Sequence, residues 1–358
     1  MHLLRTTILL AIAQVVGGLA PVAQQSLPTA IRWSVEISAS PAASPVIDHD
    51  HVFIVLQSGV VSARTISDGS SSWEVPLKSD RALVADGGRV YAATADQIVA
   101  LNAADGTKAW SIQSAPVTAP LAAQGGWLIA ATAKSLTAFR TADGSQVWTR
   151  DLAGVEVTPT LEGDNLYVPL SDGRLLAITL QTGADRWVKT FVGPLSEVLA
   201  FPDQILFGTG DRSFFGLRAV DGELDWQRVR LGSIVRGRPI ADEHHVYVAA
   251  MDNTLRAYRR SNGALLWHPS VPFRPTTGPT LIDGAVVVAG SAAELRAFTA
   301  SNGAPAGQIT LPESLVLPPA FGKSGDAMLM SAFTGTLNGS FKLVLSGPPA
   351  AAPEAPRE

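Results

Sequence analysis

Two pairs of closely spaced histidines are the residues of this chain best suited by type to bind a metal. His49 and His51 lie in one predicted turn, and His244 and His245 lie in another. Imidazole nitrogens are common ligands of transition metals, so each pair could hold an ion. However, an aspartate precedes each pair in the same place, as expected for a repeated turn. We therefore interpret these histidines as ordinary turn residues and expect no metal site.

A run of arginines could act through binding. Its members are Arg212, Arg218, Arg228, Arg230, Arg236, Arg238, Arg256, Arg259 and Arg260. Acidic residues are interleaved with them, which favours a solvated and partly paired surface. The alternative is a partner-binding face formed by Arg228, Arg230, Arg236 and Arg238. The formal net charge of −4 gives no general attraction to nucleic acid or to anionic lipid.

Several kinds of catalytic chemistry find no support in the sequence. The chain has 0 Cys, which excludes disulfides, thiolate metal sites, cysteine nucleophiles and attachment of lipid to an N-terminal cysteine. No Gly-x-Ser-x-Gly motif is present, and no glycine-rich phosphate loop opens a helix. We therefore expect no catalytic residues and no cofactor.

The pattern that organises the chain is a glycine followed four residues later by tryptophan. It occurs six times, with the tryptophans 37, 38, 39, 39 and 41 residues apart. A seventh copy, Asn302-Gly303, has Gly307 in place of the tryptophan. The predicted turn glycines are Gly69, Gly106, Gly144, Gly183, Gly222, Gly263 and Gly303. A fixed period near forty residues indicates a repeat architecture.

Each repeat predicts four short strands. A proline in an apolar run precedes a turn, a β-rich triplet such as 90–92 follows, and then a third strand such as 98–101. The glycine turn leads into the strand that carries tryptophan. Four strands per forty residues are typical of a propeller blade, so we predict an all-β propeller. We interpret the tryptophans as structural residues that dock neighbouring blades: Trp33, Trp73, Trp110, Trp148, Trp187, Trp226 and Trp267.

The ends of the repeat predict how the ring closes. Seven units run from Ser34 to Gly307, and the segment after them contains three further strands but no tryptophan strand. Residues 31–35, around Trp33, form such a strand without a blade of their own. We therefore predict eight four-stranded antiparallel blades, the last closed by the N-terminal strand. Seven blades are the alternative. We expect the missing tryptophan at Gly307 to leave blade seven more loosely docked.

The two termini are predicted to lie outside the propeller. Residues 1–23 combine Arg5, a short apolar run and small residues, which predicts a secretory signal with an uncertain cleavage point; an uncleaved membrane anchor is the alternative. The propeller domain is predicted over 24–346, and 347–358 form a Pro/Ala-rich tail expected to be disordered. We expect a periplasmic monomer that has no integral membrane domain and associates with the outer membrane.

The repeat resembles that of the PQQ-like propeller superfamily. The resemblance covers the chain from Ile31 to about Leu345 and is clearest over 90–110, 166–187 and 246–267. Trp-Asp dipeptides of WD40 propellers are absent. Length, blade number and export signal make the chain similar to the BamB family of non-catalytic scaffolds. That resemblance implies a protein partner, the barrel-assembly protein of the outer membrane. The alternatives are another periplasmic partner or ligand, or a quinoprotein dehydrogenase.

Overall fold

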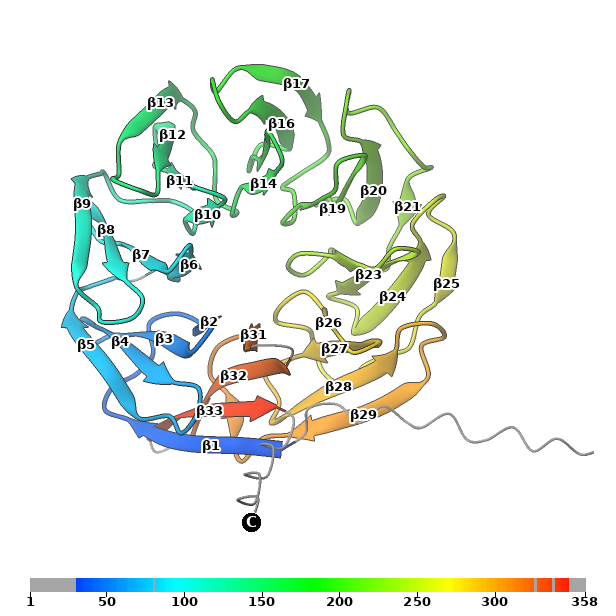
Figure 1. Cartoon of the computed structure of the whole chain (residues 1–358). Coiled ribbons are helices and arrows are strands. Elements are labelled where there is room, and N and C mark those ends of the chain that lie inside the picture. The colour runs from blue at the N-terminus through cyan, green and yellow to red at the C-terminus, as the bar shows by residue number, and fades with distance from the viewer. Residues whose placement is uncertain (1–29, 80, 325–326, 337–338, 348–358) are drawn as a thin grey trace, which may run out of the picture.

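The protein is a closed ring of eight β-sheets around a central axis (Figure 1). The computed structural model describes residues 30–79, 81–324, 327–336 and 339–347. The predicted signal at 1–23 lies outside the described residues, as does the predicted tail except for Gly347. Seven sheets have four antiparallel strands, and the eighth has five. The predicted eight-bladed propeller is confirmed, and the seven-bladed alternative is wrong.

Blades one to eight each contain four strands ordered from the axis to the rim. The innermost strands are β2 (Val46–Asp48), β6 (Val84–Asp86), β10 (Ala122–Gln124), β14 (Thr160–Glu162), β18 (Leu199–Ala200), β22 (Ile240–Ala241), β26 (Thr280–Ile282) and β31 (Ala320–Ser324). The second strands are β3 (His51–Leu56), β7 (Arg89–Ala93), β11 (Trp127–Ala131), β15 (Asn165–Pro169), β19 (Gln204–Gly208), β23 (His245–Ala250), β27 (Ala285–Ala289) and β32 (Ala327–Gly335).

The outer half of each blade is built in the same order. The third strands are β4 (Val60–Thr65), β8 (Gln97–Asn102), β12 (Ser135–Arg140), β16 (Arg174–Thr179), β20 (Ser213–Arg218), β24 (Thr254–Arg259), β28 (Glu294–Thr299) and β33 (Phe341–Gly347). The outermost strands are β5 (Ser71–Pro76), β9 (Lys108–Gln113), β13 (Gln146–Asp151), β17 (Asp185–Thr190), β21 (Val229–Arg230), β25 (Leu265–Trp267), β29 (Pro305–Thr310) and β1 (Ala30–Ile37). A two-residue strand, β30 (Ser314–Leu315), also pairs with β32.

Burial follows from this layering. The second strands are buried along almost their whole length, as in β11, because a neighbouring blade covers each face of the sheet. The outermost strands instead alternate between exposed and covered positions, as in β17, because they border the solvent. The hydrophobic core is therefore a ring of clusters shared by successive blades.

The N-terminal strand closes the ring as the sequence predicts. β1 pairs antiparallel with β33, so Trp33 lies opposite Leu345 and Val35 lies opposite Leu343. The first and last described segments of the chain thus share one sheet. Pairing with β1 covers the edge of β33, which would otherwise be open to pairing with other chains.

Blade five departs from the repeat at its rim. In blade four, Ala177 lies opposite Trp187, and this register continues to the end of the strand. In blade five the same register would place Phe214 opposite Arg228, but Phe214 pairs with Val229, the next residue. One extra residue is therefore accommodated between Trp226 and Val229, and β21 is only two residues long.

Candidate functional site

The tryptophans lie at the junctions between blades and make the same hydrogen bond at six of them. Each indole Nε1 donates to a backbone carbonyl of the next blade, the third residue before that blade's turn glycine. The pairs are Trp33–Ile66 at 2.8 Å, Trp73–Ala103 at 2.9 Å, Trp110–Thr141 at 2.9 Å, Trp148–Leu180 at 2.7 Å, Trp187–Ala219 at 3.1 Å and Trp267–Ala300 at 3.0 Å. The donor is satisfied although the ring is largely removed from water.

The turn glycines are the other half of these junctions. All seven have φ between +69° and +75°, a region that side chains with a Cβ adopt only with strain. A Cβ on any of them would lie 2.0–2.9 Å from the indole of the preceding blade. The tryptophan of one blade therefore rests on the glycine turn of the next, and we call this pair a Trp–Gly joint.

The missing tryptophan of blade seven has a structural explanation. Gly307 lies opposite Ala297, in the place that tryptophan occupies in other blades. A tryptophan there would need a glycine turn in blade eight. Blade eight has no such turn, because its third and outermost strands, β33 and β1, come from opposite ends of the chain. The looser docking of blade seven stays a prediction.

Blade five has its tryptophan but an incomplete joint. Trp226 is 4% exposed and contacts Gly263, yet its Nε1 has no hydrogen-bond partner among the described residues. In blades one to four and blade six, an alanine of the third strand lies under the indole, as Ala177 does under Trp187. Blade five has Gly216 at this position, and a Cβ there would lie 2.3 Å from the indole of Trp226. The ring therefore sits closer to its own sheet. The carbonyl of Arg260, which it would otherwise bind, accepts from Gln204 instead, at 3.1 Å.

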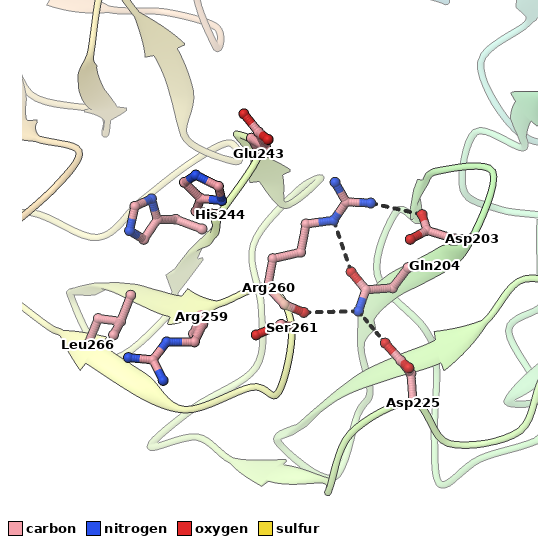
Figure 2. A pocket seen from close by; sticks show the side chains of 10 residues that line it. Asp203, Gln204, Asp225, Glu243, His244, Arg259, Arg260, Ser261 and Leu266 are labelled. Atoms are coloured by element: carbon pink, nitrogen blue, oxygen red, sulfur yellow. Dashed lines mark hydrogen bonds and ion pairs between the residues drawn. The ribbon is translucent and has the colours of Figure 1, made fainter.

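A polar network replaces the missing bond between blades five and six, and Figure 2 shows its residues among those that line a pocket. Gln204 is 3% exposed and also donates to Asp225 at 2.5 Å, while its Oε1 accepts from Arg260 Nε at 3.2 Å. Arg260 additionally donates to Asp203 at 2.9 Å and lies 3.8 Å over the ring of Phe201. Every bond of Arg260 named here crosses the junction.

The pocket above this network has a volume of about 610 Å³. Glu243, His244 and His245 of blade six line it, together with Arg259 and Leu266. Sequence reasoning missed this pocket. Two signals are visible in the sequence: Gly216 stands where the third strand of the repeat has alanine, and the interval of 41 residues between Trp226 and Trp267 is the longest of the five.

The four arginines proposed as a partner face occupy two different places. Arg228 and Arg230 flank Asp211 at 4.0 Å and 3.4 Å, at the outer edge of blade five. Arg236 and Arg238 precede β22, the innermost strand of blade six. Their separation follows from the fold, because a chain leaving the rim of one blade enters the next blade at the axis.

Arg238 and Glu197 influence each other near the axis. Desolvation by the surrounding protein lowers the pKa of Arg238, and the nearby charge of Glu197 opposes that shift. The residue as a whole remains exposed. Desolvation raises the pKa of the Glu197 carboxyl, and Arg238 and Arg236 oppose that shift. Arg236 Nε also donates to the carbonyl of Thr276 in the segment leading to blade seven, at 3.0 Å.

His49 and His244 lie in the predicted turns, whereas His51 and His245 are the first residues of β3 and β23, and the two pairs belong to blades one and six. His49 contacts Asp48 at 2.6 Å, and His245 contacts Asp242 at 3.0 Å. Although desolvation opposes it, hydrogen bonds from Tyr247, His244 and His245 lower the pKa of Asp242. Within the described ranges, no group of three or more His, Asp or Glu side chains is placed to hold a metal ion. No helix in the described part of the chain is long and apolar enough to cross a membrane.

Known proteins share this repeat and this ring. A protein of Yersinia pestis named outer membrane protein assembly factor BamB is 24% identical over 162 residues, covering 40% of this chain and 41% of that protein. The chain thus aligns with less than half the length of this curated relative. The crystal structure of BamB from Moraxella catarrhalis superposes with a TM-score of 0.70 and 15% identity, covering 88% of this chain and 99% of that one.

Quinoprotein enzymes share the fold as well. A quinohemoprotein alcohol dehydrogenase from Comamonas testosteroni superposes with a TM-score of 0.70 and 13% identity, covering 92% of this chain and 78% of that one. At such identity the likeness concerns the fold alone. The family described as outer membrane protein assembly factor BamB matches residues 74–194 and 188–315, which is most of the propeller. With its eight blades and its Trp–Gly joints, the chain belongs to the BamB family of PQQ-like repeat propellers.

Proposed function

We propose that this protein is a non-catalytic periplasmic scaffold that assists the assembly of outer-membrane β-barrel proteins through protein–protein contacts. Membership of the BamB family is the observation that carries the proposal. The signal predicted at 1–23 supports export. The proposed partner is the outer-membrane barrel-assembly protein.

A contact surface for this partner is proposed at Arg236 and Arg238. They lie where the chain enters blade six near the axis, away from the outer strands. Arg238 is exposed, and apart from the more distant influence of Glu197 it makes no ion pair within 4.0 Å among the described residues, so it retains donors for a carboxylate of a partner. Arg228 and Arg230, which flank Asp211 at the rim, are the less favoured pair.

Crosslinking in the cell tests the partner. The native protein is crosslinked, purified, and its neighbours are identified by mass spectrometry. Recovery of the barrel-assembly protein supports the proposal. Recovery of a different envelope protein, with the barrel-assembly protein absent, contradicts it and favours the alternative of another periplasmic partner.

Charge reversal tests the contact surface. Arg236→Glu combined with Arg238→Glu should weaken partner binding at least tenfold, because each reversal replaces an attraction with a repulsion. The matched control is Arg228→Glu with Arg230→Glu, which makes the same change in net charge at the rim. Equal loss in both double variants would indicate a general charge effect and contradict a localised surface. Binding is measured by titration at two salt concentrations.

Quinone binding is the second candidate because quinoprotein dehydrogenases share this ring. The purified propeller is titrated with pyrroloquinoline quinone and calcium, and tryptophan fluorescence reports occupancy. Saturable binding with dye-linked alcohol oxidation would contradict the scaffold proposal. A flat titration agrees with it.

A further inference from the structure

Trp–Gly joints divide the eight junctions of the ring into two classes. Complete joints, with both the glycine contact and the Nε1 hydrogen bond, connect blades eight, one, two, three, four and five in series. One more complete joint connects blade six to blade seven through Trp267. The junction between blades five and six lacks the hydrogen bond, and the junction between blades seven and eight lacks the tryptophan.

The innermost strands show the same division independently of the tryptophans. Neighbouring inner strands lie close together at six junctions, including β22 and β26 of blades six and seven. At the other two junctions, β18 to β22 and β26 to β31, the inner strands approach each other at fewer positions. These are again the boundaries between blades five and six and between blades seven and eight.

Blades six and seven are tied together by additional contacts. The hydroxyl of Tyr247 in blade six donates its proton to Asp242 at 2.6 Å and also contacts the carbonyl of Ala300 in blade seven at 3.2 Å, the same oxygen that accepts from Trp267. Near the axis, Gly278 approaches the backbone of Arg238 so closely that a Cβ would lie 2.0 Å from its carbonyl oxygen. Arg236 adds its bond to Thr276. Four ties at rim and axis thus join these two blades.

The junction between blades five and six is hollowed at both of its ends. The polar pocket of about 610 Å³ lies at one end, beside Asp203 and Glu243. A second pocket of about 100 Å³ lies at the other end, between Pro194–Ser196 with Gly208–Gly210 of blade five and Ile234–Val235 leading to blade six. Pockets also lie at the junctions of blades one and two, four and five, and six and seven, so a hollow alone does not mark this junction. The junction of blades five and six differs in combining a pocket at each end with an incomplete joint, and it gives up dispersion contacts that a filled junction would make.

We infer that blades six and seven form a two-blade unit that moves as one body against the other six blades, opening the ring at the junction of blades five and six. The network of Gln204 and Arg260 is the latch of this junction, because its bonds are the ones that take the place of the missing joint. Arg236 and Arg238 travel with the unit, whereas Glu197 stays with blade five. Opening therefore separates Arg238 from Glu197 and widens the pocket.

Hydrogen exchange measured by mass spectrometry on the full protein tests this unit. Gln204→Ala should raise exchange about tenfold in both blade six and blade seven, and leave blades one to four unchanged, because loss of the latch favours opening. Arg89→Ala is the matched control. Arg89 holds the same position in blade two and donates to Thr141 and Ala142 of blade three, but the joint of Trp110 at that junction is complete. Its effect should stay below about twofold.

Two results would overturn the inference. One is faster exchange in Gln204→Ala that is confined to the edges of blades five and six, with blade seven unaffected. The other is faster exchange in all eight blades alike. If Gln204→Ala does not fold, the native protein in low denaturant decides: amides of blades six and seven should share one opening equilibrium, distinct from that of blades one to four. Separate equilibria for the two blades would contradict the unit.

Discussion

At the scale of single residues, the indole of one blade and the glycine of the next work as one joint. The glycine supplies a backbone with positive φ and a surface without a side chain, and the indole supplies area and a hydrogen-bond donor. Removing either half therefore affects two blades. The sequence predicted that the seven tryptophans dock blades and that the seven glycines form turns. It did not predict that each tryptophan packs on the turn glycine 33 to 37 residues further along the chain.

Replacing tryptophan by phenylalanine isolates the hydrogen bond. Trp148→Phe should lower the free energy of unfolding by about 1–3 kcal/mol more than Trp226→Phe. Trp148 donates to the carbonyl of Leu180 at 2.7 Å, and that oxygen would lose its partner, whereas Trp226 has no acceptor among the described residues. Both variants lose the same volume, so the difference reports the bond. Urea denaturation provides the measurement, and equal losses would contradict its role.

Two glycine-to-alanine changes separate backbone strain from the close approach of the indole. Gly163→Ala should cost about 1 kcal/mol, because φ is +55° and nothing lies within 4 Å of the new Cβ. Gly183→Ala should cost about 2–4 kcal/mol, because φ is +71° and Trp148 lies 2.8 Å from the new Cβ. Thermal unfolding compares them. A Gly183→Ala variant as stable as Gly163→Ala would show that the indole moves aside freely.

At the scale of elements, the regular blades could be predicted from the sequence and the irregular ones could not. The closing strand around Trp33 was predictable because it carries a tryptophan without a blade. The extra residue in the rim of blade five was not, because the longer interval between Trp226 and Trp267 does not say where the added residues lie, and only strand pairing in three dimensions places the shift. The pocket beside it was missed because residues of two blades line it, and only the fold brings them together.

Restoring the repeat in blade seven should not stabilise it. Gly307→Trp should lower the free energy of unfolding by about 1–3 kcal/mol, because φ is +131° and blade eight offers no glycine turn to receive the ring. The reverse change, Trp267→Gly, removes a tryptophan whose partner turn is present and should cost about 3–5 kcal/mol. Equilibrium denaturation tests both. A stabilised Gly307→Trp variant would show that a tryptophan at this position needs no turn.

At the scale of the whole molecule, burial should delay ionisation of every tyrosine until the ring unfolds. Desolvation raises the pKa of Tyr91 and Tyr247 above the ordinary value of 10.0, and raises that of Tyr167 and Tyr258 to about 12. The chain has 4 Tyr, so none remains to titrate normally. Because folding favours the neutral phenol, this stabilisation is complete below pH 10 and is lost as the pH rises towards 12.

Alkaline titration measures this effect. Phenolate absorbance and tryptophan fluorescence should change together above pH 10, since the phenols ionise as the protein unfolds. The chain in guanidinium chloride is the control and should titrate near pH 10. Phenolate absorbance that rises near pH 10 while the fluorescence stays native would contradict the burial of these hydroxyl groups.

Because β1 and β33 pair in one sheet, the ring does not depend on where along it the chain begins and ends. Ala30 pairs with Gly347, so a short linker could join the two ends without moving either strand. New termini could then be placed at the open turn of Gly163, which has no neighbour within 4 Å of a Cβ. Such a circular permutant should fold to the same propeller. Blade eight would then be formed by consecutive residues, and the chain termini would lie in blade four.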